Sequence, residues 1–176
     1  MFPLTKKVIV FLFVLIACKA SAQEPGKGDI QWMSFEQAVA KSKANPKKIF
    51  VDVYTKWCGW CKRMDASTYT DPQVIAYMNE HFYAVKLDAE TRDTVHFADR
   101  IFVYREEMRA NEIALSLLNQ KMSYPTSVYL DENFDMLSPV PGYQTTQQLL
   151  PQLRYFGDNI YKAKSWDVYS KETSGQ

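Results

Sequence analysis

The amino-acid sequence predicts one α/β domain in which helices flank both faces of a central mixed β-sheet. The chain has 176 residues, of which 47% are apolar, so it can bury one core and is short for two domains. Segments rich in β-branched and aromatic residues alternate with segments of helical periodicity, which is the order of strands covered by helices. The formal net charge is only +1, so no nucleic-acid partner is expected.

The first 22 residues are typical of a secretory signal peptide. Lys6 and Lys7 precede an apolar run over 8–17, which is too short to span a bilayer. Ala20-Ser21-Ala22 then provides the small residues that a signal peptidase requires before Gln23. The alternative, a buried N-terminal helix or strand, does not account for this order of basic, apolar and small residues.

Cys18 gives the same region a second interpretation. Residues 15–18 resemble the bacterial lipobox, in which the cysteine is lipidated and becomes the first residue of the mature chain. Cleavage after Ala22 and lipidation at Cys18 are both left open. We expect an exported protein, either in the periplasm or anchored as a lipoprotein that faces it. Contact with a membrane is expected only if Cys18 is lipidated.

Residues 23–29 predict a polar tether before a domain over 30–170. The segment 30–33 predicts an edge strand. Ser34 and Gln37 have the spacing of a capping box, so a helix is expected from there to about Asn45-Pro46.

The segment 48–54 is apolar almost throughout, which predicts a central strand buried on both faces. Asp52 interrupts this strand, and a buried carboxylate is costly unless it is paired or functional. A helix is then expected from Cys58 or Gly59 toward Thr68. A further helix, opened by Asp71-Pro72 and ending near His81, precedes a strand over 82–88.

The segment 91–123 is expected to hold a small hairpin, with strands at 94–97 and 101–104, and a helix over 106–120.

The C-terminal part predicts a strand over 126–130, a turn at 131–133 and a strand over 136–140 that ends at Gly142. A final long helix is expected over 145–164, in which Pro151 and Gly157 indicate a kink or a break.

The candidate reactive segment is 57–62. It consists of Trp57, Cys58, Gly59, Trp60, Cys61 and Lys62. Cys58 is expected at the start of a helix, where unpaired N–H groups and the helix dipole stabilise a thiolate and lower its pKa. Cys61 follows one turn later, so the two sulfurs can cycle between dithiol and disulfide. Cys58 is the candidate nucleophile and Cys61 the resolving cysteine, while Gly59 and Trp60 tune the redox poise.

Two other interpretations of the cysteine pair remain. A structural zinc site needs four ligands, and the sequence has no second Cys-x-x-Cys or nearby Cys/His cluster. A static disulfide is the second alternative, which the position at a helix start disfavours. The preferred interpretation needs no metal and no organic cofactor.

Residues 51–54 followed by the segment 57–62 resemble the active-site strand and motif of the thioredoxin family. This resemblance implies a thioredoxin fold in which Asp52, six residues before Cys58, moves a proton to or from Cys61. Tyr124-Pro125-Thr126 resembles the family's cis-proline segment beside the substrate groove, so Pro125 is expected to be cis. Gly142 matches a glycine near that groove.

The resemblance implies a thiol–disulfide oxidoreductase that acts on protein substrates in the cell envelope. Its redox partner would be another thiol protein, soluble or membrane-bound. Two alternatives stay open: a binding or chaperone module with idle cysteines, and a dedicated maturation factor for one thiol protein.

Two departures from the family matter. Trp60 stands where thioredoxins proper have proline, so the sequence leaves the reaction direction open between reductant, oxidant and isomerase. The insertion 91–123, before the cis-proline strand, resembles that of exported thioredoxin-like proteins of the Bacteroidetes type. We expect this insertion to shape partner choice.

Overall fold

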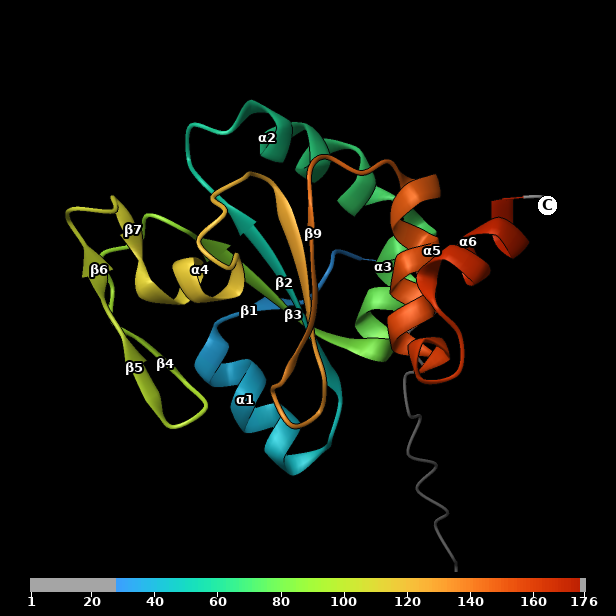
Figure 1. The fold of residues 1–176 in the computed structure, drawn as a ribbon, viewed down its shortest axis with the longest axis horizontal. Coiled ribbons are helices and arrows are strands. Elements are labelled where there is room, and N and C mark those ends of the chain that lie inside the picture. The colour runs from blue at the N-terminus through green and yellow to red at the C-terminus, as the bar shows by residue number, and fades with distance from the viewer. Residues whose placement is uncertain (1–27, 175–176) are drawn as a thin grey trace, which may run out of the picture.

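The computed structural model describes residues 28–174 (Figure 1), so the expectations for 1–22, for Cys18 and for most of the tether lie outside the described residues. A five-stranded mixed sheet forms the centre, in the order β1-β3-β2-β8-β9. Its strands are β1 (Trp32–Met33), β2 (Lys48–Tyr54), β3 (Phe82–Asp88), β8 (Thr126–Leu130) and β9 (Met136–Pro141). The pairs β1–β3 and β2–β3 are parallel, whereas β8 is antiparallel to both β2 and β9. The predicted fold class is confirmed.

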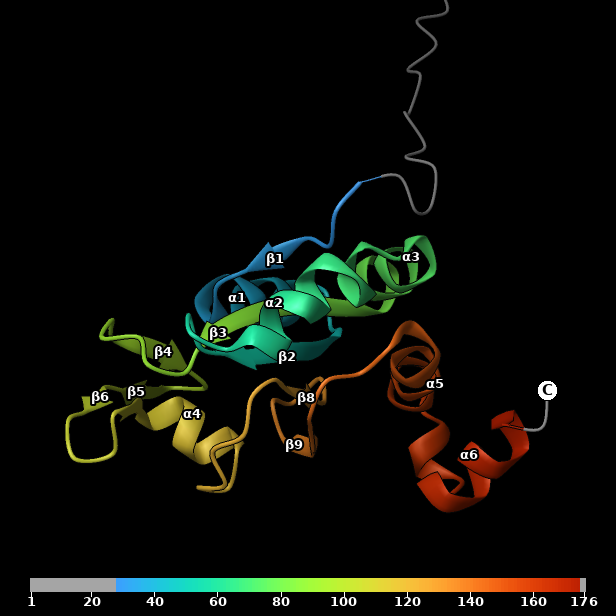
Figure 2. The same cartoon turned by 90° about the horizontal axis from the view of Figure 1, so that it is seen from above.

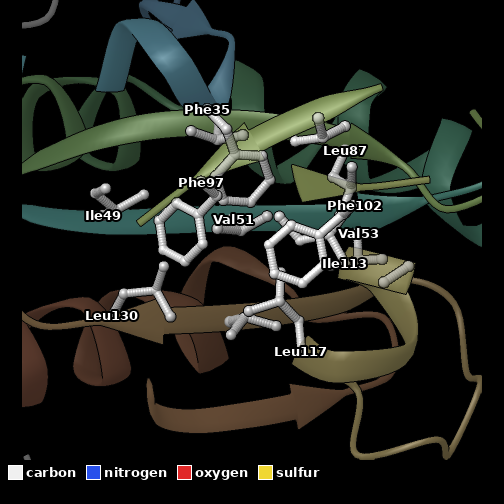
Figure 3. Packing of buried hydrophobic residues seen from close by; sticks show 14 of the residues in the cluster. Phe35, Ile49, Val51, Val53, Leu87, Phe97, Phe102, Ile113, Leu117 and Leu130 are labelled. Atoms are coloured by element: carbon white, nitrogen blue, oxygen red, sulfur yellow. The ribbon is translucent and has the colours of Figure 1, made fainter. Parts of the chain in front are cut away.

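One face of the sheet is covered by α1 (Phe35–Ala44) together with the insertion. The helix α1 begins at the predicted capping box, in which the Ser34 hydroxyl accepts from the Gln37 N–H and the Gln37 side chain accepts from the Ser34 N–H. Aromatic side chains of the insertion, Phe97 and Phe102, point into the same core as the strand residues (Figure 3). The insertion is therefore a layer of the core.

The other face carries four helices and two 3₁₀ turns. They are α2 (Gly59–Ala66), η1 (Thr68–Thr70), α3 (Pro72–His81), α5 (Thr146–Gly157), η2 (Ile160–Lys162) and α6 (Trp166–Ser174). In Figure 1, α3, α5 and α6 lie to the right of the sheet, while α1, α4 and the insertion lie to its left. Figure 2 shows α5 and α6 grouped at one end of the molecule, opposite the insertion. Helices thus cover both faces, as the alternation of strands and helices predicts.

The insertion contains two small hairpins and a short helix. Its elements are β4 (Val95–Phe97), β5 (Arg100–Phe102), β6 (Tyr104–Arg105), β7 (Ala110–Asn111) and α4 (Glu112–Leu117). The first hairpin confirms the prediction, but the helix expected over 106–120 forms only over 112–117, so the prediction is wrong for 106–111 and for 118–120. Asn111 is fully buried, donates to the backbone oxygens of Thr91 and Asp93, and caps α4 by accepting from the Ile113 N–H. This buried cap fixes the helix start and overrides the helical propensity of the residues before it.

The C-terminal region also differs from the single helix expected over 145–164. Helix α5 continues through Pro151 and ends at Gly157, and Asn159 then adopts a left-handed conformation with φ of 61°. A Cβ at residue 157 would meet the Tyr77 hydroxyl at 2.6 Å, so any larger residue there would displace the Tyr77 side chain of α3. The break falls at one of the two predicted residues, and α6 follows it as a helix that the sequence pattern did not reveal.

Among residues 28–174, no helix has both the length and the apolar character needed to cross a membrane.

Candidate functional site

The two cysteines of the 57–62 segment form a disulfide at the start of α2. Cys58 is the N-cap of this helix, and its Sγ accepts a hydrogen bond of 3.0 Å from the Cys61 N–H. The Cα atoms of the pair are 5.3 Å apart, as one helical turn allows. When the disulfide is open, the same N–H and the helix dipole stabilise negative charge on the Cys58 sulfur. The local structure therefore suits a pair that alternates between disulfide and dithiol.

The predicted groove residues Tyr124, Pro125 and Gly142 are joined to one another and, through Tyr124, to Trp57 of the cysteine motif. The Tyr124–Pro125 peptide bond is cis, as expected. The Pro125 oxygen accepts a hydrogen bond of 2.8 Å from the Gly142 N–H, and Gly142 has a φ of 100°, which favours glycine. The Tyr124 ring lies 5.8 Å from the Trp57 ring, so the proline loop borders the cysteine motif.

Thr126 has a different position from the other groove residues. Its side chain is buried and donates to the Ser123 oxygen at 2.8 Å, while its backbone pairs with Val53 in the sheet. Thr126 thus anchors the start of β8, and Tyr124, in the loop before it, contacts Trp57 of the cysteine motif.

The two tryptophans of the motif are exposed and have different neighbours. Trp57 donates from Nε1 to Glu90 Oε1 at 3.0 Å. The Trp60 ring lies 5.4 Å from the Tyr143 ring. Tyr143 is half-buried, packs against the core and also joins Trp60 at the surface. Its position directly after Gly142 was the sequence signal that could have identified it.

Gly59 and Lys62 complete the motif. A Cβ at Gly59 would meet no heavy atom within 4 Å, so no close approach requires a glycine there. Lys62 is exposed, and no ion pair involves it within the described part of the chain.

Asp52 is 1% exposed on β2 and lies beneath α2, the helix that carries Cys61. Its Oδ2 is 3.3 Å from Lys86 Nζ, and Lys86 also pairs with Asp65 on α2. Burial raises the pKa of the Asp52 carboxyl from its ordinary 3.8 to about 6, against the opposing attraction of Lys86. Because this pKa lies close to neutral pH, the Asp52 carboxyl can bind or release a proton at the pH at which thiols react.

Lys86 and Asp65 were not identified from the sequence. Lys86 is the lone cation of β3, whose residues before it are apolar or aromatic, and the register places it directly beside Asp52. Its ammonium group lies 5.1–5.5 Å from the ring centres of Trp32, Tyr54 and Tyr69. This cage of aromatic rings and two carboxylates holds the charge of Lys86 at the sheet face below α2.

The hydroxyl group of Tyr69 lies beside Asp52 and Ser127. Antiparallel register pairs Asp52 with Ser127 on β8, and the buried Tyr69 of η1 packs over this face. Burial, followed by the negative charge of Asp52, raises the pKa of the Tyr69 hydroxyl well above its usual range. Tyr69 therefore keeps its proton and stays a neutral neighbour of the acid.

Within residues 28–174, no three side chains of His, Cys, Asp or Glu converge as they would in a metal centre.

Comparison with known proteins gives one family model that covers most of the chain. Residues 20–148 match the model Thioredox_DsbH, which is described as "Protein of unknown function, DUF255". Among curated proteins, the thiol:disulfide interchange protein DsbD of Pseudoalteromonas atlantica is 31% identical over 70 residues, which are 39% of this chain and 12% of that protein. The chain spans only 9% to 12% of the length of the curated relatives that it matches.

Solved structures show the same fold at low identity. A putative disulphide-isomerase from Bacteroides thetaiotaomicron has a TM-score of 0.55 and 23% identity, and the match covers 82% of this chain and all of that one. A DsbH oxidoreductase has a TM-score of 0.54 and 18% identity, over 81% of this chain and 91% of that one. At these identities the likeness establishes the thioredoxin fold.

Proposed function

Since the chain belongs to the DUF255 family of thioredoxin-like proteins, we propose that it is a thiol–disulfide oxidoreductase that acts on protein substrates. The observation that carries this proposal is the Cys58–Cys61 disulfide at the start of α2, with the Cys61 N–H on the Cys58 sulfur. The cis-proline loop beside the pair and the buried Asp52 below α2 support it.

The proposed reaction has two exchange steps. In the reduced protein, the Cys58 thiolate attacks one sulfur of a substrate disulfide, a new S–S bond forms, and the second substrate sulfur leaves as a thiolate that takes a proton. The Cys61 sulfur then loses its proton, attacks Cys58 Sγ and releases the first substrate sulfur as a thiolate. Two electrons pass to the substrate and the Cys58–Cys61 disulfide forms. The reverse sequence oxidises a substrate dithiol.

Asp52 is proposed to accept the proton of the Cys61 thiol in the second step. A carboxyl with a pKa of about 6 is largely ionised at neutral pH and can still be protonated transiently. Lys86 holds this carboxyl in place and is proposed as a positioning residue.

The direct test uses insulin reduction and trapping. Wild type should reduce insulin disulfides in the presence of a small dithiol, and Cys58→Ser should not. Cys61→Ala should accumulate mixed disulfides with its substrates, since the second step is removed. Many captured proteins would favour general exchange, whereas one or two would favour a maturation factor. Insulin reduction by wild type no faster than by Cys58→Ser would favour a binding module.

We further propose that the protein works outside the cytoplasm, in the periplasm or as a lipoprotein that faces it. The basic, apolar and small-residue regions of residues 1–22 support export, and Cys18 supports a lipid anchor. Its redox partner would then be a second thiol protein, which can be membrane-bound. Mass spectrometry of the mature N-terminus separates a lipidated Cys18 from a free Gln23, and a full-length N-terminus would contradict export.

A further inference from the structure

Two large aromatic side chains remain exposed beside the disulfide. Trp57 is 65% exposed and Trp60 is 57% exposed, while Cys58 and Cys61 are almost completely buried. Aromatic rings left in water beside a reactive group are typical of a surface that a partner covers. The charges on the two sides of this surface differ, and they indicate which partner segment fits where.

The Trp57 side is acidic. Glu90 accepts from the Trp57 indole at 3.0 Å. Asp88 is a second carboxylate on this side, and the exposed Lys56, which lies 3.4 Å from it, offsets one of the two negative charges. Burial, followed by the charges of Glu90 and Asp88, raises the pKa of the Tyr124 hydroxyl to about 12. A negatively charged partner residue is disfavoured on this side.

The Trp60 side is basic. Trp60 and Arg63 share one face of α2, of which Ser67 is the C-cap. The Arg63 guanidinium lies 5.8 Å from the Trp60 ring centre and 5.9 Å from that of Tyr143. The Tyr143 hydroxyl and Ser67 Oγ are 3.3 Å apart, which fixes the tyrosine against the helix.

Among residues 28–174, neither cation on this part of α2 has a carboxylate partner. No carboxylate pairs with Lys62 or Arg63 within the described residues, since Lys86 pairs with Asp65, the acid of α2. This side thus offers aromatic surface together with unneutralised positive charge.

We propose that Trp60, Arg63 and Tyr143 form a recognition subsite for an acidic side chain next to the reactive cysteine of the partner protein. The partner's carboxylate pairs with Arg63, while its methylene groups and adjoining backbone pack on the two rings. The acidic Trp57 side repels the same residue, so the charge difference also orients the partner chain across the disulfide. This inference rests on the proposed function, because it concerns what the reduced Cys58 attacks.

The test uses peptides with one cysteine that is joined to thionitrobenzoate through a disulfide. Three peptides differ only in the residue next to cysteine, which is Glu, Gln or Lys. Attack by Cys58 releases the coloured thiol, and its appearance gives the second-order rate constant. For wild type we expect the Glu peptide to react about two- to five-fold faster than the Gln peptide, the size of an exposed charge pair, and the Lys peptide to react slowest. High salt should reduce this preference.

The Glu/Gln rate ratio, which cancels any change in Cys58 itself, is the readout for the variants. Arg63→Gln should bring the ratio to about one, and Arg63→Lys should keep most of it. The control Arg154→Gln, an exposed arginine near the end of α5, should leave it as in wild type. Equal Glu and Gln rates in wild type, or an unchanged ratio in Arg63→Gln, would overturn the subsite. If no peptide reacts faster with wild type than with Cys58→Ser, the proposed function fails as well.

Discussion

The Lys86 ammonium lies 3.3 Å from Asp52 Oδ2 and also pairs with Asp65, so one cation joins β3 to β2 and to α2. The resolving cysteine is on that same helix. The charge of Asp52 is therefore linked both to the stability of the fold and to the environment of the reactive pair.

Asp52→Asn is expected to stabilise the oxidised protein above pH 6. The folded-state pKa of about 6 exceeds the ordinary 3.8, so the folded protein binds the proton more tightly than the unfolded chain. The stabilisation that protonated Asp52 contributes is fully present below about pH 3.8 and is lost as the pH rises through about 6. At about 1.4 kcal/mol per pKa unit, the loss reaches about 2–3 kcal/mol, which the Asn side chain avoids.

Chemical denaturation at pH 4 and pH 8 measures this effect. The free energy of unfolding of Asp52→Asn should equal that of wild type at pH 4 and exceed it at pH 8. The exposed control Asp29→Asn should have the free energy of unfolding of wild type at both pH values. A variant less stable than wild type at pH 8 would contradict the account of Asp52.

Lys86→Met is expected to raise the pKa of Asp52 beyond about 6, because the attraction that opposes burial is removed. The variant should lose about 3–5 kcal/mol at pH 8, where Asp52 is then an unpaired buried charge, and much less at pH 5. The double variant Lys86→Met/Asp52→Asn should recover most of the loss at pH 8. Equal losses at both pH values would show that Lys86 acts through packing alone.

Phe97→Ala should destabilise the protein by about 3–5 kcal/mol, because Phe97 is a core residue of the insertion. Its ring lies 5.0 Å from Phe35 and 5.8 Å from Phe134, and it is 9% exposed. The matched variant Ile101→Ala, in the same hairpin but 64% exposed, should change stability by less than about 0.5 kcal/mol. Denaturant midpoints compare the two, and similar small losses would mean that the hairpin is not part of the core.

Partner choice by the insertion stays a prediction. Deleting 94–104 would remove core residues as well as surface, so substitution at Ile101 is the cleaner test. Captured mixed disulfides of Cys61→Ala with and without Ile101→Ser would compare the substrates, and identical sets would count against a role of this exposed site.

Two glycine substitutions near the disulfide should have opposite outcomes. Gly59→Ala has open space and no positive φ, so stability should be kept within about 1 kcal/mol. Gly142→Ala places a Cβ at a φ of 100° and should cost about 1–3 kcal/mol. Thermal unfolding of both variants measures the contrast, and equal effects would contradict the backbone conformations at these positions.

Much of the fold could be predicted because strong local signals mark its elements. Asp71 caps α3 through the Gln73 and Val74 N–H groups with Pro72 directly after it, and this helix has its predicted start and end. The strands over 48–54, 82–88 and 126–130 also match, because continuous apolar runs bounded by polar residues define them.

The remaining features depend on contacts distant in sequence. Nothing local indicates that Lys86 lies beside Asp52, because this follows only from the parallel register of β2 and β3. The Asn111 side chain caps α4 and also donates to the backbone oxygens of Thr91 and Asp93, which are distant in the sequence. The helix-forming residues before Asn111 predict an earlier helix start, and nothing local indicates this contact. The cysteine motif identifies the site from the sequence alone. The pairing of Lys86 with Asp52 and Asp65 follows only from the three-dimensional structure.

The central claim, that Cys58 and Cys61 form a reversible redox pair, is tested most directly by a redox titration. The protein is equilibrated in thiol–disulfide buffers, free thiols are alkylated, and the mass gives the fraction reduced. We expect one two-electron transition whose midpoint reduction potential lies between about −270 mV and about −120 mV. A value near the first would indicate a reductant, and a value near the second an oxidant. A pair that stays oxidised below about −300 mV, as static structural disulfides do, would contradict the account.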